Sequence, residues 1–263
     1  MGRLKLSYKR VPADTTKYGE GYTLNSLSRE HFQRFNESVP GLGDISRRGQ
    51  YTQALVAFLD PEGFTDFSNQ VDSHLVVPEF MKTYLSWIFS SISETFKEGE
   101  TEDTVRIWGS LPFFAKFLGD GLLFIWDTEY SGGASGIQNI VLNLLDVTES
   151  YKSELLPTLK KSVSKPPSRV RCGIARGQIM TVGDGNDFVG SCLNIASRLQ
   201  KLSMLSFAIS RRGIDLTRGK RAPKEFVIKK VELRGIGKEE LVYVRKSELE
   251  ALPAKERKLF KEP

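Results

Sequence analysis

The most informative stretch of this chain is Leu55-Val56-Ala57-Phe58-Leu59-Asp60-Pro61-Glu62-Gly63-Phe64-Thr65. From Tyr51 to Leu59 the residues are mostly strand formers with an almost continuous apolar centre, which predicts a strand buried on both faces. Asp60 follows the last apolar residue and opens a turn signal. A carboxylate at this position is a candidate site residue, but aspartate is also an ordinary turn residue. This motif alone therefore does not identify a functional site.

A second aspartate, Asp120, stands at the tip of a predicted hairpin. Residues 113–118 and 122–126 have the composition of strands, and Gly119-Asp120-Gly121 between them is a tight-turn signal. If both strands lie side by side in one sheet, the carboxylates of Asp60 and Asp120 converge, and such a pair repels unless a cation lies between them. Mg²⁺ and Mn²⁺ need few protein carboxylates when substrate phosphates supply other ligands. Together the two aspartates favour a metal site.

The remaining periodicity predicts the element order β-α-β-β-α-β with more strands after it, which is a split βαβ layout. Helices are expected at 77–97, with Pro78 in the first turn, over about 137–151, and at 191–202. Further strands are expected at 104–108, 169–175, 178–182 (pairing back on the preceding strand), 206–210, 226–233 and 241–245, with a linker at 160–167. The fold class is therefore α/β (α+β), ferredoxin-like or palm-type.

Length and composition set the expected domain organisation. The 263 residues allow one large domain with an extension. We expect an extension at 1–50, a main domain at 51–250 and a basic tail at 251–263. In the extension, four apolar residues are expected to share one face of an amphipathic segment: Leu24, Leu27, Phe32 and Phe35.

Composition also limits the partners. The net charge of +6 favours an anionic partner without choosing among nucleotide, nucleic acid and acidic membrane. The apolar runs are far shorter than the roughly 18–20 residues of a membrane span, and the first ten residues lack the apolar core of a secretory signal. Two cysteines (Cys172, Cys192) make no disulfide framework, and two histidines (His31, His74) argue against a zinc site or a Ser-His-Asp hydrolase. A cytoplasmic protein is expected.

Four motifs in order resemble those of class III adenylyl and guanylyl cyclases. They are the opening stretch, Lys116-Phe117-Leu118-Gly119-Asp120-Gly121, Gly190-Ser191-Cys192-Leu193-Asn194-Ile195-Ala196-Ser197-Arg198-Leu199, and Val231-Glu232-Leu233-Arg234-Gly235-Ile236-Gly237. The resemblance covers residues 51–245. It implies an enzyme that closes a nucleoside triphosphate into a 3′,5′-cyclic monophosphate and releases pyrophosphate. It also implies a head-to-tail homodimer with two Mn²⁺ or Mg²⁺ ions per active site.

The resemblance implies metal and phosphate roles for the first two motifs. Asp60 and Asp120 would hold the metals, with the Pro61 carbonyl as a further ligand. Backbone N–H groups from Glu62 to Thr65, including that of Phe64, would bind the phosphates.

Three residues toward the C-terminus are implied to act on the ribose and the phosphates. Asn194 and Arg198, four apart on one helix, would orient the ribose and stabilise charge on the α-phosphate. Arg234 stands where the family usually has a phosphate-binding lysine. Since the family's metal aspartates and its Asn/Arg pair come from different subunits, the monomer should be inactive.

The base would be read by Lys116 and Asp187. This pair is the family's adenylyl pattern, yet the same donor and acceptor could serve a pyrimidine, so guanine is excluded better than adenine is selected. Tyr51 could narrow the base pocket. Other features resemble the pyrimidine cyclases of bacterial Pycsar anti-phage systems: the residues at 70–75, the aromatic helix after them, and the segment at 111–117. This resemblance implies cyclic UMP, or cyclic CMP, and a separate effector protein that responds to it.

Several alternatives stay open at this point. One is a stand-alone adenylate cyclase that makes cyclic AMP. Another is a degenerate cyclase domain that serves as a nucleotide sensor, although a sensor has no need to keep both aspartates with Asn194 and Arg198. A nucleic-acid-binding protein is disfavoured because the sheet aromatics are buried by pattern rather than arranged for stacking. The signature of diguanylate cyclases is absent.

Overall fold

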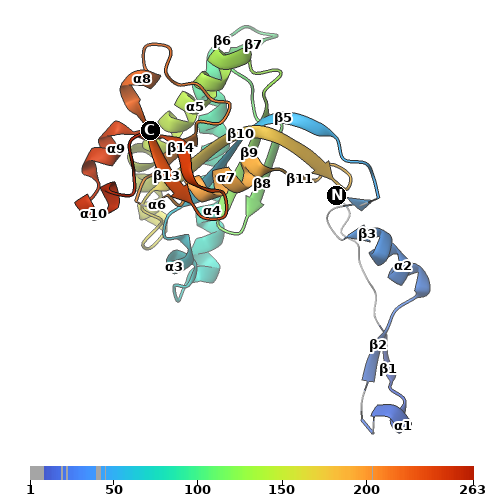
Figure 1. Cartoon of the computed structure of the whole chain (residues 1–263). Helices are drawn as coiled ribbons and strands as arrows, with labels where there is room; N and C mark the ends of the chain where they lie inside the picture. The colour runs from blue at the N-terminus through green and yellow to red at the C-terminus, as the bar shows by residue number, and fades with distance from the viewer. Residues whose placement is uncertain (1–8, 19, 22, 40–42, 45, 203) are drawn as a thin grey trace. The chain divides into compact units, whose positions relative to one another are not determined.

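The computed structural model describes residues 9–263 except 19, 22, 40–42, 45 and 203 (Figure 1). The chain forms two compact units. The smaller unit comprises Met1–Tyr51 and Ile179–Val189, and the larger comprises Thr52–Gln178 and Gly190–Pro263. Residues 1–8, most of the segment considered for a signal sequence, lie outside the described residues.

The larger unit is built on a sheet with the strand order β13-β14-β12-β10-β5-β9-β8. The strands are β5 (Tyr51–Pro61), β8 (Phe114–Leu118), β9 (Gly121–Asp127), β10 (Val170–Val182), β12 (Phe207–Ser210), β13 (Phe226–Leu233) and β14 (Gly237–Arg245). The central strand β5 pairs antiparallel with β9, which pairs antiparallel with β8, and β10 runs parallel to β12. The predicted β-α-β-β-α-β arrangement is confirmed.

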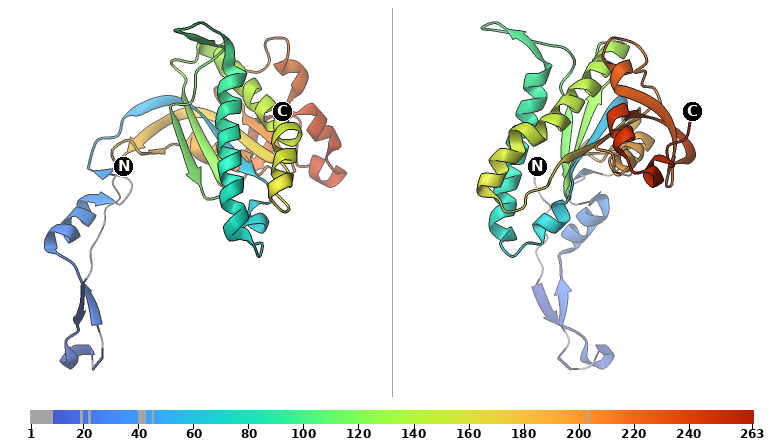
Figure 2. Two further views of the ribbon diagram at one scale, coloured as in Figure 1. Left: turned by 180° about the vertical axis from the view of Figure 1, so that it is seen from behind. Right: turned by 90° about the vertical axis from the view of Figure 1, so that its left-hand side faces the viewer.

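Helices pack on both faces of this sheet. They are α3 (Phe64–Ser68), α4 (Ser73–Phe96), α5 (Gly133–Ser150) with the π-helical turn η1 (Tyr151–Leu155), α6 (Leu156–Ser162), α7 (Ser191–Leu199), α8 (Ala222–Glu225), α9 (Lys246–Ala251) and α10 (Ala254–Arg257). Figure 2 shows α4 and α5 side by side along one face. Alternate residues of the central strands, such as Leu55 and Leu59 of β5 and Phe124 of β9, form the core with these two helices.

The opposite face carries α7, which approaches β10 closely at Gly173. A Cβ atom on Gly173 would lie 2.2 Å from the carbonyl oxygen of Ala196 and 2.3 Å from the amide nitrogen of Gln200. Glycine is therefore required at this position, because any side chain would push the helix off the strand.

Several elements differ from their sequence-based predictions. The expected pair of strands at 169–175 and 178–182 is one continuous strand, β10, because the chain does not turn at Gly177. The strand that pairs back on its end is β11 (Asp187–Val189), after a loop in which Gly183 and Gly185 have φ of 61° and 83°. The helix expected at 77–97 begins at Ser73, so Pro78 lies inside α4 rather than in its first turn.

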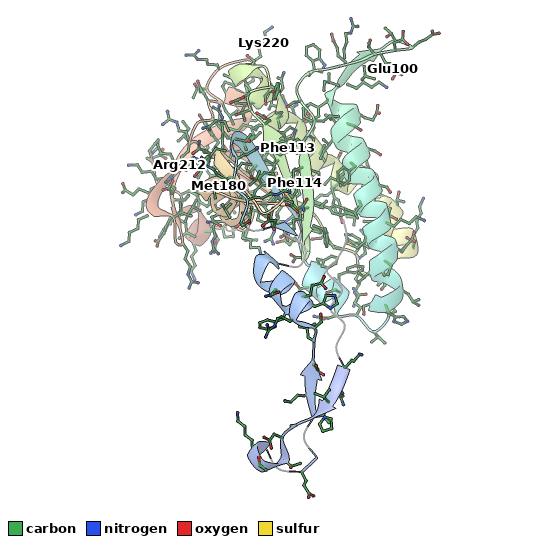
Figure 3. All side chains as sticks on the ribbon, turned by 90° about the vertical axis from the view of Figure 1, so that its right-hand side faces the viewer. Glu100, Phe113, Phe114, Met180, Arg212 and Lys220 are labelled. Carbon is green, nitrogen blue, oxygen red and sulfur yellow. The ribbon has the colours of Figure 1, made fainter. Side chains whose placement is uncertain are left out.

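The strand expected at 104–108 is β7 (Val105–Ile107), and it is not part of the main sheet. It pairs with β6 (Lys97–Glu100), which continues directly from α4. Glu100 marks the end of β6 in Figure 3. The expected linker at 160–167 begins with the last residues of α6.

The smaller unit consists of short elements. They are β1 (Lys9–Pro12), α1 (Thr15–Tyr18), β2 (Thr23–Ser26), α2 (Arg29–Glu37), β3 (Ser38–Val39), β4 (Gly43–Asp44) and β11. The prediction of a single amphipathic segment is wrong, because Leu24 lies on β2 and Phe32 on α2, and both are exposed. The side chain of Phe35 lies outside the described residues. Among the helices of the described chain, none has the length and apolarity needed to cross a membrane.

Candidate active site

The two predicted metal aspartates lie at the same end of adjacent strands. Asp60 is the next-to-last residue of β5, and Asp120 immediately precedes β9. The register pairs Leu59 with Leu122, which puts Asp60 across from Gly121. A Cβ on Gly121 would lie 3.9 Å from the Cα of Asp60, so the backbones touch where the two aspartates leave the sheet. The structure thus brings together the two residues that the sequence selected.

Asp60 is buried and is paired with an arginine of its own chain. Its side chain is only 3% exposed, and Arg171 on β10 donates to its Oδ2 from Nε at 3.1 Å and also from Nη2. Its Oδ1 accepts no hydrogen bond from any described residue. Arg171 was not predicted from the sequence, although an arginine between two apolar residues of a central strand, Val170 and Cys172, is a usable signal.

A second ion pair fixes the turn that follows Asp60. Arg169 donates to Glu62 from Nε and, at 3.0 Å, from Nη2, while Nη1 of Arg171 lies 3.7 Å from Glu62. The bonded guanidinium of Arg169 holds the pKa of Glu62 below its usual value, against the opposite effect of partial burial. The amide of Glu62 also donates to the carbonyl of Arg169 at 2.9 Å. The segment from Asp60 to Glu62 is therefore locked to β10.

The predicted phosphate-binding backbone begins directly after this turn. Gly63 has φ of +86°, and Phe64 and Thr65 are the first two residues of α3. The side chain of Phe64 packs against Phe67 and Phe80, with ring centroids 5.8 and 5.7 Å apart. The ring anchors the turn in the core, so any role of Phe64 in ligand binding falls to its backbone.

The oxygen atoms at this end of the sheet suit a hard divalent cation. The donors are the carboxylates of Asp60 and Asp120 and the carbonyl of Pro61, and all-oxygen sets are those that Mg²⁺ and Mn²⁺ prefer. No cluster of three or more His, Cys, Asp or Glu side chains suited to a metal occurs in the part of the chain that the structure describes. A metal held here would need further ligands, such as substrate oxygens, and Arg171 occupies one of the two oxygens of Asp60.

The predicted Asn/Arg helix presents its polar side outward. Cys192, Ile195 and Leu199 hold α7 on the sheet, each at most 2% exposed, whereas Asn194 and Arg198 are exposed. Arg198 lines a cavity of about 690 Å³ together with Arg234, which follows β13. Neither Asp60 nor Asp120 lines this cavity. The structure brings the two arginines together and leaves the aspartates elsewhere on the same chain.

The predicted base-reading residues are distributed over both units. Lys116 on β8 stands in a cross-strand row with Leu123 and Phe58, on the sheet face that also carries Asp60. Asp187 opens β11 in the smaller unit, and Tyr51 is an exposed residue at the start of β5. The pairing of Lys116 with Asp187 stays a prediction.

A larger cavity of about 770 Å³ contains none of the predicted site residues. It lies in the larger unit between the start of α5, the end of β12 and β14, and three arginines line it: Arg176, Arg211 and Arg212. Figure 3 labels Arg212, which forms an ion pair with Glu240 on the same wall. Since its acidic and basic side chains balance, size alone does not make this cavity the active site.

Solved cyclase structures have the same fold. The adenylyl cyclase CyaB from P. aeruginosa matches with a TM-score of 0.57 and 18% identity, over 76% of this chain and 96% of that one. A bacterial light-regulated adenylyl cyclase matches with a TM-score of 0.51 and 16% identity, over 82% and 58%. An adenylate/guanylate cyclase/hydrolase from Silicibacter pomeroyi matches with a TM-score of 0.51 and 17% identity, over 75% and 98%.

No protein-family profile and no curated protein sequence matches the chain. At these sequence identities the structural matches establish the fold alone. The chain has the fold of adenylyl and guanylyl cyclase domains, as the four motifs implied.

Proposed function

We propose that this chain is a nucleotidyl cyclase that converts a pyrimidine nucleoside triphosphate, UTP before CTP, to its 3′,5′-cyclic monophosphate and pyrophosphate. The observation that carries the proposal is the buried carboxylate of Asp60, at the end of the central strand, beside the turn that holds Asp120. A buried carboxylate is costly to keep charged, and its place next to a second carboxylate in a cyclase fold is what a divalent-cation site needs.

The proposed site uses Mn²⁺ or Mg²⁺ held by Asp60 and Asp120, with the Pro61 carbonyl as a further ligand. When bound, the two ions would activate the ribose 3′-hydroxyl and neutralise charge on the leaving pyrophosphate. Arg171 has a separate part in this proposal. Its guanidinium neutralises Asp60, and it would be free to donate to a phosphate oxygen if a cation were held by the carboxylate.

The complementary residues come from a partner subunit in this proposal. Asn194 would orient the ribose, and Arg198 and Arg234 would stabilise charge on the phosphates. The two arginines line a cavity that neither Asp60 nor Asp120 of the same chain lines. This separation of the arginines from the aspartates supports a site shared between two subunits. Two copies arranged head to tail would place each basic surface opposite the other's carboxylates and make two equivalent sites.

The pyrimidine assignment rests on the sequence. Lys116 and Asp187 are a donor and an acceptor for a base edge, with Tyr51 limiting the space, and a separate effector protein would respond to the cyclic product in anti-phage defence. A second candidate is a stand-alone adenylate cyclase, which the Lys/Asp pair favours. The same pair disfavours GTP.

Product analysis tests both candidates. The purified chain is incubated with Mn²⁺ or Mg²⁺ and with each of ATP, GTP, CTP and UTP, and the cyclic products and pyrophosphate are identified by mass spectrometry. We expect cyclic UMP as the main product, with cyclic CMP next, and no product from D60N. Cyclic AMP as the dominant product would replace the pyrimidine assignment with the adenylate cyclase. If none of the four nucleotides is cyclised, the cyclase proposal is wrong.

A further inference from the structure

The cavity that contains Arg198 and Arg234 extends well beyond these two residues. Besides the two arginines, five of its fourteen lining residues are lysines: Lys201, Lys230, Lys238, Lys258 and Lys261. Only Glu232 and Glu239 are acidic. We call this cavity the basic groove. Its size, about 690 Å³, is in the range of small-molecule sites.

The bases of the groove have no partners of their own within the described part of the chain. Within the described residues, none of the seven forms an ion pair or a side-chain hydrogen bond. By contrast, Arg169 and Arg171 are both paired with carboxylates. Like charges gathered in one concavity repel each other, and a bound anion relieves that repulsion. The groove is therefore organised for an anion.

One wall of the groove is the C-terminal segment, and it is firmly attached. Lys230 and Lys261 exchange two backbone hydrogen bonds of 2.9 Å across the edge of β13. The ring of Phe260 is buried at 7% exposure, and Arg257 donates to the carbonyl of Leu252 at 3.0 Å. Figure 1 shows the chain ending beside β13. These contacts hold the exposed lysines of the segment, Lys258 and Lys261, at the groove.

The lining favours a small oligophosphate over a nucleic acid. Lysine binds phosphate as a point charge, and several lysines around one concavity match the clustered charge of pyrophosphate. Single-stranded nucleic acids additionally need exposed aromatic faces on which bases stack. The one aromatic residue in the lining, Phe260, is buried.

We propose that the basic groove is a binding site for inorganic pyrophosphate, with Lys258 and Lys261 of the C-terminal segment as ligands in addition to Arg198 and Arg234. In the proposed reaction the ribose 3′-oxygen forms a bond to the α-phosphorus. The bond between the α-phosphorus and the oxygen that bridges it to the β-phosphorus breaks. The leaving group is pyrophosphate, and the 3′-hydroxyl proton is released. The inference rests on the proposed function for the source of this anion, whereas binding itself needs no turnover.

Calorimetric titration of pyrophosphate into the full-length protein, without nucleotide or divalent metal, tests the site. We compare the wild type with K258Q/K261Q and with the charge-matched control K220Q/K255Q, whose lysines are exposed and outside the groove. Lys220 is labelled in Figure 3. Loss of two ligand charges should weaken binding about tenfold, while the control stays within about twofold. Thermal unfolding of each variant confirms that it is folded.

Three outcomes would overturn the proposal. They are no binding of pyrophosphate to the wild type, an equal loss in both double variants, and tighter Lys258- and Lys261-dependent binding of a short single-stranded DNA. The second outcome would indicate a net-charge effect, and the third a nucleic-acid site.

Steady-state kinetics separates this inference from the proposed function. If the protein cyclises a nucleotide, K258Q/K261Q should raise the inhibition constant of pyrophosphate about tenfold, whereas K220Q/K255Q should leave it within about twofold. An inhibition constant that stays unchanged in K258Q/K261Q would contradict the proposal. If nothing is cyclised, the proposed function fails while the calorimetric result still decides the groove.

Discussion

The acidic end of β5 and the basic groove are opposite in charge and also in how their charges are balanced. Asp60 is buried, and its carboxylate is paired with Arg171 of the same chain. Arg198 and Arg234 are exposed, and neither has an ion-pair partner among the described residues. Asp60 therefore has a counter-charge within its own chain, whereas the arginines of the basic groove need an anion from outside. This difference is what a site shared between two subunits would require.

The largest effect should come from separating the two regions genetically. D60A and R198A should each lose at least about 10²–10³-fold in cyclisation rate, because each lacks a group that neutralises charge in the transition state. An equimolar mixture that exchanges subunits should recover roughly a quarter of wild-type activity, since half of its dimers are mixed and each mixed dimer has one intact site. The measurement is the rate of cyclic product formation after exchange.

The control for this experiment is a mixture of wild type with the D60A/R198A double variant. It forms mixed dimers in which every site lacks a group, so its activity should come from wild-type dimers alone. If subunit exchange is verified by native mass spectrometry and D60A with R198A still shows no recovery, the two regions do not act across subunits.

The sequence predicted those parts of the two regions that depend on residues close together in the chain. The strand ending at Asp60, the turn at Gly119 and Gly121, and the helix with Asn194 and Arg198 are encoded locally, by apolar runs, glycines and helical spacing. These local patterns predicted the central fold and the convergence of the aspartates. Arg198 and Arg234 were selected by the resemblance to cyclase motifs rather than by these local patterns.

Features that depend on contacts distant in the sequence were not predicted. Arg171 lies 111 residues from Asp60, and no local pattern links them. The C-terminal segment has the composition of a basic tail, but its packing depends on Phe260 and on the backbone pairing of Lys261 with Lys230. A break was predicted between the strands at 169–175 and 178–182, but this segment lies within the continuous strand β10. Tertiary context decided each of these cases.

Removal of Arg171 should have the next largest effect. R171M leaves a buried carboxylate without its partner and should lower the free energy of unfolding by about 3 kcal/mol in the absence of metal. The matched control is R169M, whose partner Glu62 is a third exposed, and its loss should be below about 1 kcal/mol. Urea unfolding without divalent cations measures both.

Adding a divalent metal extends the comparison of R171M with R169M. Because the proposed cation would use the carboxylate that Arg171 is bonded to, Mn²⁺ should stabilise R171M more than it stabilises the wild type, and R169M should resemble the wild type. Equal stabilisation of all three proteins would mean that Arg171 and the metal do not compete for Asp60.

A third effect concerns the packing of α7, the helix that carries Arg198 of the basic groove, against the sheet. G173A puts a Cβ 2.2 Å from the carbonyl oxygen of Ala196 and should cost about 2–3 kcal/mol of unfolding free energy. G177A, on the same strand, meets the Cβ of Cys192 at 3.2 Å and should cost less than about 1 kcal/mol. Thermal unfolding ranks the two variants, and an equal cost would contradict close packing of α7 at Gly173.

The smallest effect is a pH dependence at the acidic end. Because Arg169 lowers the pKa of Glu62 in the folded state, the ionised form stabilises the fold above the ordinary value of 4.5, and this contribution is lost as the pH falls through the lowered value. E62Q should therefore be less stable than the wild type by about 0.5–1 kcal/mol at pH 7, after allowance for solvent exposure of the pair. The difference should shrink toward pH ~3 in urea titrations.

The control for this pH dependence is E129Q. It removes an exposed glutamate that has no ion pair among the described residues, and it should follow the wild type at both pH values. A difference for E62Q that is as large in acid as at neutral pH would mean that the glutamate acts through packing rather than through its charge.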